Sequence, residues 1–209
     1  MPQPTSTGGS APSRRLADLR AELLRLVKDR GHQHFSEPVM LASGELSHDF
    51  IDGKAACANG RHLELACRTI LTLVGDRGVR FDAVGGLTLG ADHFSHGVAM
   101  LSKADWFTVR KQPKGRGTNR LVEGHALAAG ERVLLVDDVV TTGGSIRTAY
   151  EVIRSLEVDV VFATTLVDRG DAAQRYFAAQ NVLYEPVFTY RDLEIAPVGN
   201  GSHYAASLG

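Results

Sequence analysis

Residues 132–146 read Arg-Val-Leu-Leu-Val-Asp-Asp-Val-Val-Thr-Thr-Gly-Gly-Ser-Ile and carry the strongest structural signal in the chain. The apolar run at 133–136 is too short for a helix and suits a strand that is buried on both faces. A turn of small residues follows at 141–145, and a helical pattern covers 146–156. This order of strand, small-residue loop and helix N-terminus predicts a phosphate-binding site, because backbone N–H groups and the helix dipole attract an anion.

Two adjacent carboxylates, Asp137 and Asp138, follow the apolar run at the end of the predicted strand. They would repel a phosphate, so we interpret them as partners of sugar hydroxyls or as metal ligands, and the implied ligand is a phosphorylated sugar. An ATPase site is an alternative, but the chain has no Gly-x-x-x-x-Gly-Lys-Ser/Thr pattern. The glycine-rich segment 85–90 does not fit the dinucleotide-binding pattern either, and a purely structural turn would not require the whole ordered run.

The composition limits the class of protein. Of the 209 residues, 44% are hydrophobic and 22% are charged, and the net charge of −1 gives no reason to expect binding to nucleic acid or to an anionic membrane. The sequence shows neither an apolar run of membrane-spanning length nor a hydrophobic signal region, so we expect a cytoplasmic protein. In that compartment Cys57 and Cys67 are expected to be reduced core thiols.

Predicted strands alternate with predicted helices along the chain. Residues 1–12 are rich in Pro, Ser, Thr and Gly and are expected to be a disordered tail, and residues 13–209 are expected to form a single domain. We predict helices at 13–31, 61–74, 92–101, 146–156 and 172–180, strands at 81–85, 106–111, 133–136, 158–167 and 182–188, and a hairpin within 33–52. This alternation predicts an α/β fold with a mostly parallel central sheet flanked by helices, whose ligand sits at the carboxyl ends of the strands.

A basic loop follows the strand predicted at 106–111. It places four cations, Arg110, Lys111, Lys114 and Arg116, within seven residues, and its proline and glycines argue against a helix. Mobile cations of this kind can close on a pyrophosphate leaving group and exclude water. A solvated surface loop is the alternative, which the position after a core strand disfavours.

Several segments resemble known families. Residues 133–145 resemble the motif that binds 5-phosphoribosyl-1-pyrophosphate (PRPP) in the type I phosphoribosyltransferases, and 85–90 resembles their pyrophosphate-contacting loop. The basic loop resembles the Arg-Lys-x-x-Lys-x-His-Gly loop of the orotate phosphoribosyltransferases, with Arg116 in the histidine position. Segment 41–52 resembles the part of that family that forms a hood over the base, and 168–169 resembles its Asp-Arg pair facing the orotate ring.

The resemblance implies the type I phosphoribosyltransferase fold with a small N-terminal hood at about 33–55, and transfer of phosphoribosyl from PRPP to orotate in pyrimidine biosynthesis. On this resemblance, PRPP and pyrophosphate bind to Arg110, Lys111, Lys114, Arg116, Asp137, Asp138, Thr141, Thr142, Gly143, Gly144 and Ser145. The resemblance also implies which residues act in catalysis, namely Lys114, Arg116, Asp137 and Asp138. The residues that it implies for orotate binding are Phe50, Thr141 and Arg169. The cofactor would be Mg²⁺ held by substrate and water rather than directly by protein, and the protein would be a homodimer.

Three departures from the family pattern leave alternatives open. Ala42 and Asp49 replace residues of the hood, and Arg116 cannot carry a labile proton near neutral pH as histidine can, so proton donation would pass to Lys114 or water. A phosphoribosyltransferase for another base and a non-catalytic PRPP-binding regulator are therefore the alternatives. The pair His32 and His34 receives no role from the sequence.

Overall fold

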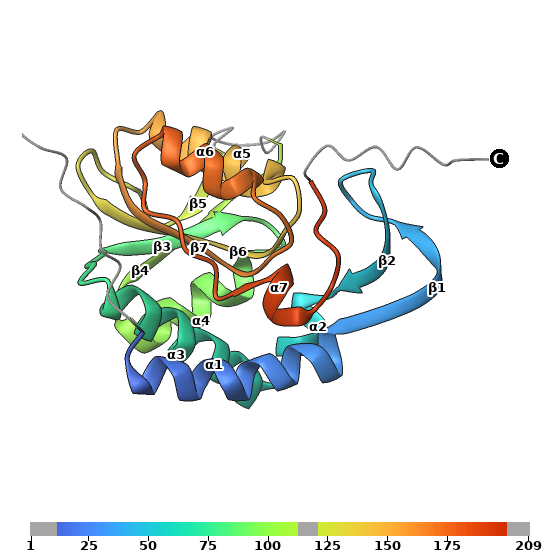
Figure 1. Cartoon of the computed structure of the whole chain (residues 1–209). Coiled ribbons are helices and arrows are strands. Elements are labelled where there is room, and N and C mark those ends of the chain that lie inside the picture. The colour runs from blue at the N-terminus through green and yellow to red at the C-terminus, as the bar shows by residue number, and fades with distance from the viewer. Residues whose placement is uncertain (1–11, 113–120, 200–209) are drawn as a thin grey trace, which may run out of the picture.

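A computed structural model describes residues 12–112 and 121–199 (Figure 1). Its main sheet has six strands in the order β5-β4-β3-β6-β7-β8. The strands are β3 (Ala83–Leu87), β4 (Asp105–Val109), β5 (Val122–Gly124), β6 (Arg132–Val140), β7 (Asp159–Asp168) and β8 (Phe188–Thr189). All neighbouring pairs are parallel except β4 and β5, which are antiparallel. The predicted mostly parallel sheet is confirmed.

Helices cover both faces of this sheet (Figure 1). One face carries α3 (Gly60–Asp76) and α4 (Asp92–Ser102), with α1 (Arg14–Leu26) packed against α3, and the other carries α5 (Gly144–Arg154) and α6 (Ala172–Ala179). Alternate residues of β6 serve the two cores: Leu134 and Val136 pack in the cluster of α3 and α4, and Val133 and Leu135 in that of α5 and α6. The apolar run is thus buried on both faces, as its composition predicts.

A second, two-stranded sheet forms the hood, which projects from one end of the molecule (Figure 1). Strands β1 (His32–Met40) and β2 (Leu46–Ile51) pair in an antiparallel hairpin, which confirms the predicted hairpin. A single π-helical turn, η1 (Val27–Gly31), joins α1 to β1, and the short helix α2 (Gly53–Cys57) follows β2. After α7 (Tyr190–Leu193), the chain passes beside the hood, where the Gly199 N–H donates a 2.6 Å hydrogen bond to Glu45.

Two predicted strands differ from the structure. Both aspartates after the apolar run lie within β6 rather than beyond it, because β6 continues to Val140 and pairs there with Asp168. The strand predicted at 182–188 is present only in part: Phe188–Thr189 forms β8 and Tyr184 makes an isolated parallel bridge, and the rest of the segment is irregular. Pro186 interrupts this segment because it has no N–H to donate to a ladder.

Other boundaries differ by a few residues. Strand β3 begins two residues later than predicted, and β5, α2 and α7 have no counterpart among the predicted elements. Cys57 and Cys67 are free and buried, as expected, and burial raises the pKa of each thiol to about 12. Within 12–112 and 121–199, none of the helices combines the length and hydropathy that a membrane span needs. The predicted tail falls almost wholly outside the described residues.

Candidate active site

A cavity of about 400 Å³ opens at the carboxyl ends of the central strands. It is lined by the loop Thr141–Ser145, by Asp137 of β6, by Lys111 after β4 and by Ala42 and Ser43 of the hood. These residues come from segments far apart in the sequence, and the structure brings them together where parallel sheets bind their ligands. The cradle, Asp137, Lys111 at the start of the basic loop and the hood thus line one cavity, whereas Asp138 and Arg169 are not among its described lining residues.

The loop from β6 to α5 is the predicted anion cradle. Gly143 adopts the left-handed conformation with φ of +79° and directly precedes the first residue of α5. A residue without Cβ adopts this conformation at no steric cost, which lets the chain turn sharply into the helix. The N-terminus of α5 then directs unpaired backbone N–H groups and the positive end of the helix dipole to this side of the cavity.

The glycine-rich turn after β3 lies directly against the acid pair. A Cβ atom on Gly90 would lie 2.6 Å from Oδ1 of Asp138 and 2.7 Å from Oδ1 of Asp137. Asp92 holds the turn in place, because its two carboxylate oxygens accept hydrogen bonds from Thr88 at 2.7 Å and from Thr108 at 3.1 Å. The peptide bond between Thr88 and Leu89 is cis. Glycine at position 90 is required by this close approach.

The two aspartates of the pair have different surroundings. Oδ1 of Asp137 accepts a hydrogen bond from the Asp138 N–H at 2.9 Å, while its buried Oδ2 has no hydrogen-bond partner among the described residues. Burial, reinforced by the charge of Asp138, raises the pKa of Asp137 to about 8. Asp138 instead uses both oxygens, accepting from Val139 N–H and from Lys54 Nζ, each at 2.7 Å. Of the two, only Asp137 is among the described residues that line the cavity.

Lys54 is a site residue that the sequence analysis missed. Asp52 caps α2 by accepting hydrogen bonds from the Lys54 and Ala55 N–H groups, both at 3.0 Å, and so starts the helix that carries this lysine. The ion pair with Asp138 raises the pKa of Lys54, although burial opposes the shift. The Asp-Gly-Lys cap is readable in the sequence, but its partner lies 84 residues away and no local pattern identifies it.

Arg169 is buried, with a relative exposure of 1%. Its guanidinium donates to the backbone carbonyl of Asp49 at 2.6 Å, to Ser47 Oγ at 3.1 Å and to the carbonyl of Ala196 at 3.4 Å. Arg169 is therefore not an exposed surface arginine. Arg169 joins the end of β7 to the hood, and burial lowers its pKa.

The remaining predicted site residues either do not line the cavity or lie outside the described residues. Phe50 is half-buried in β2 and, like Arg169, is not among the described residues that line the cavity, so their contact with the base stays a prediction. Arg110 lies at the base of the basic loop and donates to Glu123 of β5 at 3.0 Å. Lys114 and Arg116 fall outside the described residues.

The structure gives the pair His32 and His34 a clear contact. Both imidazoles bond Oδ1 of Asp49 in the hood, His32 at 2.8 Å and His34 at 2.9 Å. Burial raises the pKa of Asp49, but these two hydrogen bonds outweigh it and the pKa lies below its usual value. The residue that departs from the family pattern at position 49 is thus an internal anchor of the hood.

A family model for the phosphoribosyl transferase domain matches residues 93–182. The chain is 39% identical over 163 residues to the orotate phosphoribosyltransferase of Streptomyces coelicolor, covering 76% of this chain and 87% of that protein. It is also 35% identical to that of Aquifex aeolicus, covering 83% and 97%. The chain belongs to the orotate phosphoribosyltransferase family.

Solved structures of this family have the same fold. The orotate phosphoribosyltransferase of Mycobacterium tuberculosis in complex with PRPP superposes with a TM-score of 0.67 at 32% identity, covering 85% of this chain and 99% of that one. The enzyme of Aeropyrum pernix superposes with a TM-score of 0.71 at 31% identity, covering 82% and 95%. The orotate phosphoribosyltransferase fold expected from the sequence motifs is therefore confirmed.

Proposed function

We propose that the protein transfers the phosphoribosyl group of PRPP to orotate, giving orotidine 5′-monophosphate and pyrophosphate in cytoplasmic pyrimidine biosynthesis. The observation that carries the proposal is that the anion cradle, Asp137, Lys111 and the hood line the same cavity. A phosphate, a ribose and a pyrophosphate each find complementary groups there. The identity of relatives over most of their length supports the choice of orotate as the base.

The reaction displaces pyrophosphate from the anomeric carbon, so positive charge grows on the ribose and negative charge on the leaving group. Little covalent work falls to the protein, and positioning with electrostatic stabilisation dominates. Thr141–Ser145 would hold the 5′-phosphate, and Asp137 would accept or donate hydrogen bonds at the ribose hydroxyls. Lys54 neutralises Asp138, which limits the repulsion between the acid pair and the anionic substrate.

The basic loop would receive the leaving group. Lys111 already lines the cavity, and Arg110 is held at the start of the loop by Glu123. We propose that these two residues, together with Lys114 and Arg116, stabilise the departing pyrophosphate. Arg169 would act on the base side, together with Phe50 and Thr141, since its guanidinium orders the hood segment that covers the cavity.

The site fits a Mg²⁺ ion that is bound mainly by substrate and water. Carboxylate oxygens are the ligands that Mg²⁺ and its hydration shell prefer, and Oδ2 of Asp137 has no hydrogen-bond partner among the described residues. When bound, the ion would neutralise part of the pyrophosphate charge. Asp137 would orient the water and hydroxyl groups around it.

We also propose a homodimer. An apolar hollow of about 460 Å³ on the outer side of α4 and β4 is lined by His96, Ala99, Met100, Ala104 and Trp106. Met100 is 67% exposed and Trp106 is 42% exposed, although both are large and apolar. Exposed apolar patches of this kind mark contact surfaces. Light scattering at micromolar concentration should give twice the mass of one chain, and a monomer would contradict the proposal.

The test of the activity is orotate consumption, followed by absorbance, with PRPP and Mg²⁺ present and each omitted in turn. Loss of orotate that requires both would support the proposal. Turnover with another base only would indicate a phosphoribosyltransferase of different specificity, for which Ala42 and Asp49 are the reasons. PRPP binding by calorimetry without turnover of any base would instead indicate a regulator.

A further inference from the structure

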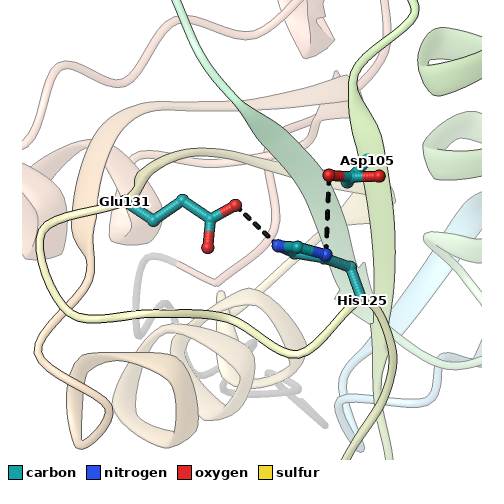
Figure 2. A group of neighbouring side chains, drawn as sticks. All are labelled: Asp105, His125 and Glu131. Atoms are coloured by element: carbon teal, nitrogen blue, oxygen red, sulfur yellow. Dashed lines mark hydrogen bonds and ion pairs between the residues drawn. The ribbon is translucent and has the colours of Figure 1, made fainter.

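A second group of polar side chains lies at the opposite end of the sheet from the cavity. Asp105 is the first residue of β4, His125 directly follows β5, and Glu131 directly precedes β6 (Figure 2). One donor atom from each residue lies within 4.8 Å of the others, and within 12–112 and 121–199 no other trio of such residues meets this condition. Neither the cavity nor the proposed reaction uses these residues.

Glu131 fixes the orientation of the imidazole. Its Oε1 lies 2.8 Å from Nε2 of His125, and its Oε2 accepts a hydrogen bond from the Ala128 N–H at 2.9 Å. Both oxygens of a largely buried carboxylate are thus engaged, so the carboxylate is held rigidly and the neutral ring carries its proton on Nε2. Nδ1 is then left with a free lone pair that points toward Asp105 (Figure 2).

The spacing on the other side of the ring suits a cation better than a hydrogen bond. Nδ1 lies 3.5 Å from Oδ2 of Asp105, longer than an ordinary hydrogen bond. Two ligands of one tetrahedral Zn²⁺ lie roughly 3.4 Å apart, because each sits about 2.0–2.2 Å from the ion. A ligating histidine that donates its other ring N–H to a carboxylate is the usual arrangement around protein-bound metals.

We propose that Asp105 and His125 bind one divalent transition-metal ion, with Zn²⁺ the best suited, while Glu131 orients the imidazole and water completes the coordination. An imidazole ligand favours Zn²⁺ over Mg²⁺, so this site is distinct from the Mg²⁺ of the proposed reaction. The exposed side chain of Asp105 leaves room for water ligands. The bound ion would join the start of β4 to the residue that follows β5.

The test uses the full chain freed of metal by a chelator. Titration with ZnCl₂ should show one site per chain by calorimetry and raise the melting temperature, and Co²⁺ should give the visible absorption of a tetrahedral or five-coordinate ion. Asp105→Asn and His125→Gln should abolish both signals, and Glu131→Gln should weaken binding about tenfold or more. His62→Gln, in α3 and outside the cluster, is the matched control and should bind as the parent does.

Asp105→Asn keeps the proposal testable if His125→Gln does not fold, because Asp105 is exposed and its loss leaves the His125–Glu131 contact intact. Equal Zn²⁺ binding by the parent and by Asp105→Asn would show adventitious binding elsewhere and overturn the proposal. Absence of Zn²⁺ binding by the parent would also overturn it, and the cluster would then be a purely structural contact between β4, β5 and β6. The test does not depend on catalytic activity, so its failure leaves the proposed function intact.

Discussion

The carboxyl end of β6 and the hood each bury an aspartate, yet the pKa values of these two carboxyl groups are shifted in opposite directions. Asp137 is 2% exposed and Asp49 is 8% exposed. Burial and the adjacent Asp138 charge raise the pKa of Asp137 to about 8. Burial also raises the pKa of Asp49, but hydrogen bonds from His34 and His32 lower it further than burial raises it.

The difference shows that hydrogen-bond donors and neighbouring charges, and not burial alone, set the pKa of a carboxyl group. Asp49 has two donors and stays ionised, which makes it an internal anchor for β1 and β2. Asp137 lies beside a second carboxylate and lines the cavity, and its buried Oδ2 has no hydrogen-bond partner among the described residues. The hood therefore contains a carboxylate that two imidazoles keep ionised, whereas the site contains a buried carboxyl group whose pKa is raised.

The largest expected effect is a loss of PRPP affinity in the variant Asp137→Asn. This near-isosteric change replaces one carboxyl oxygen of the aspartate that lines the cavity with an amide group, so PRPP affinity should fall by about tenfold or more, as for a buried hydrogen bond to substrate that is lost. Calorimetry with PRPP and Mg²⁺ measures it. Asp159→Asn, at the exposed start of β7, is the control. Unchanged affinity would remove Asp137 from ribose binding.

The same variant should change the pH dependence of stability. Between the ordinary value of 3.8 and about 8, the unfolded Asp137 carboxyl has lost its proton while the folded one retains it. This group therefore makes the parent less stable as pH rises through that window, and the loss is complete above it. Asn does not titrate, so the stability of Asp137→Asn relative to the parent should rise from pH 4 to pH 8 in denaturant melts. A constant difference would contradict the raised pKa.

Asp49→Asn should show the opposite trend. The pKa of Asp49 is lowered in the folded state, so its ionised form stabilises the fold above pH 3.8, and this contribution is lost as pH falls below that value. We expect a cost of about 1–3 kcal/mol in the free energy of unfolding at pH 7, because a buried charge-assisted contact is lost. The cost should shrink in melts below pH 3.8. A cost that stays the same in acid would mean that the two histidines act through packing alone.

The smallest expected effect is that of Lys54→Met. Its ion pair with Asp138 is more than half exposed on the lysine side, so the stability change should be at most about 1 kcal/mol. The charge of Lys54 also lowers the pKa of Asp137, so its removal should move the Asp137 titration to higher pH in carboxyl NMR spectra. In Lys54→Arg, which keeps the positive charge, the Asp137 carboxyl should titrate at the same pH as in the parent. If the Asp137 titration does not move in Lys54→Met, the charge of Lys54 has no effect on the acid pair.

Much of the site was predictable because its signals are local. The phosphate cradle needs a strand, a small-residue turn and a helix start in immediate succession, and residues 133–145 contain all three. The apolar run of β6 predicted a strand buried on both faces, and the alternation of elements predicted the parallel sheet. The parallel sheet in turn predicted that the cradle and the basic loop meet, because parallel strands end at one edge.

Contacts between distant segments were not predictable in this way. The pairing of Lys54 with Asp138, the clamp of His32 and His34 on Asp49, and the burial of Arg169 under the hood join residues that share no local pattern. The irregular segment after α6 shows the reverse case, where an apolar pattern suggested a strand but Pro186 prevented regular pairing.

The sequence by itself therefore determined the family, the sheet and the strand, turn and helix start of the predicted cradle, since each depends on residues that are neighbours along the chain. Only the tertiary structure decided which aspartate of the pair lines the cavity, which cation neutralises its neighbour, and why the pKa of Asp49 is lowered while that of Asp137 is raised. A pKa depends on every charge and dipole within a few ångströms, and folding alone brings those groups together.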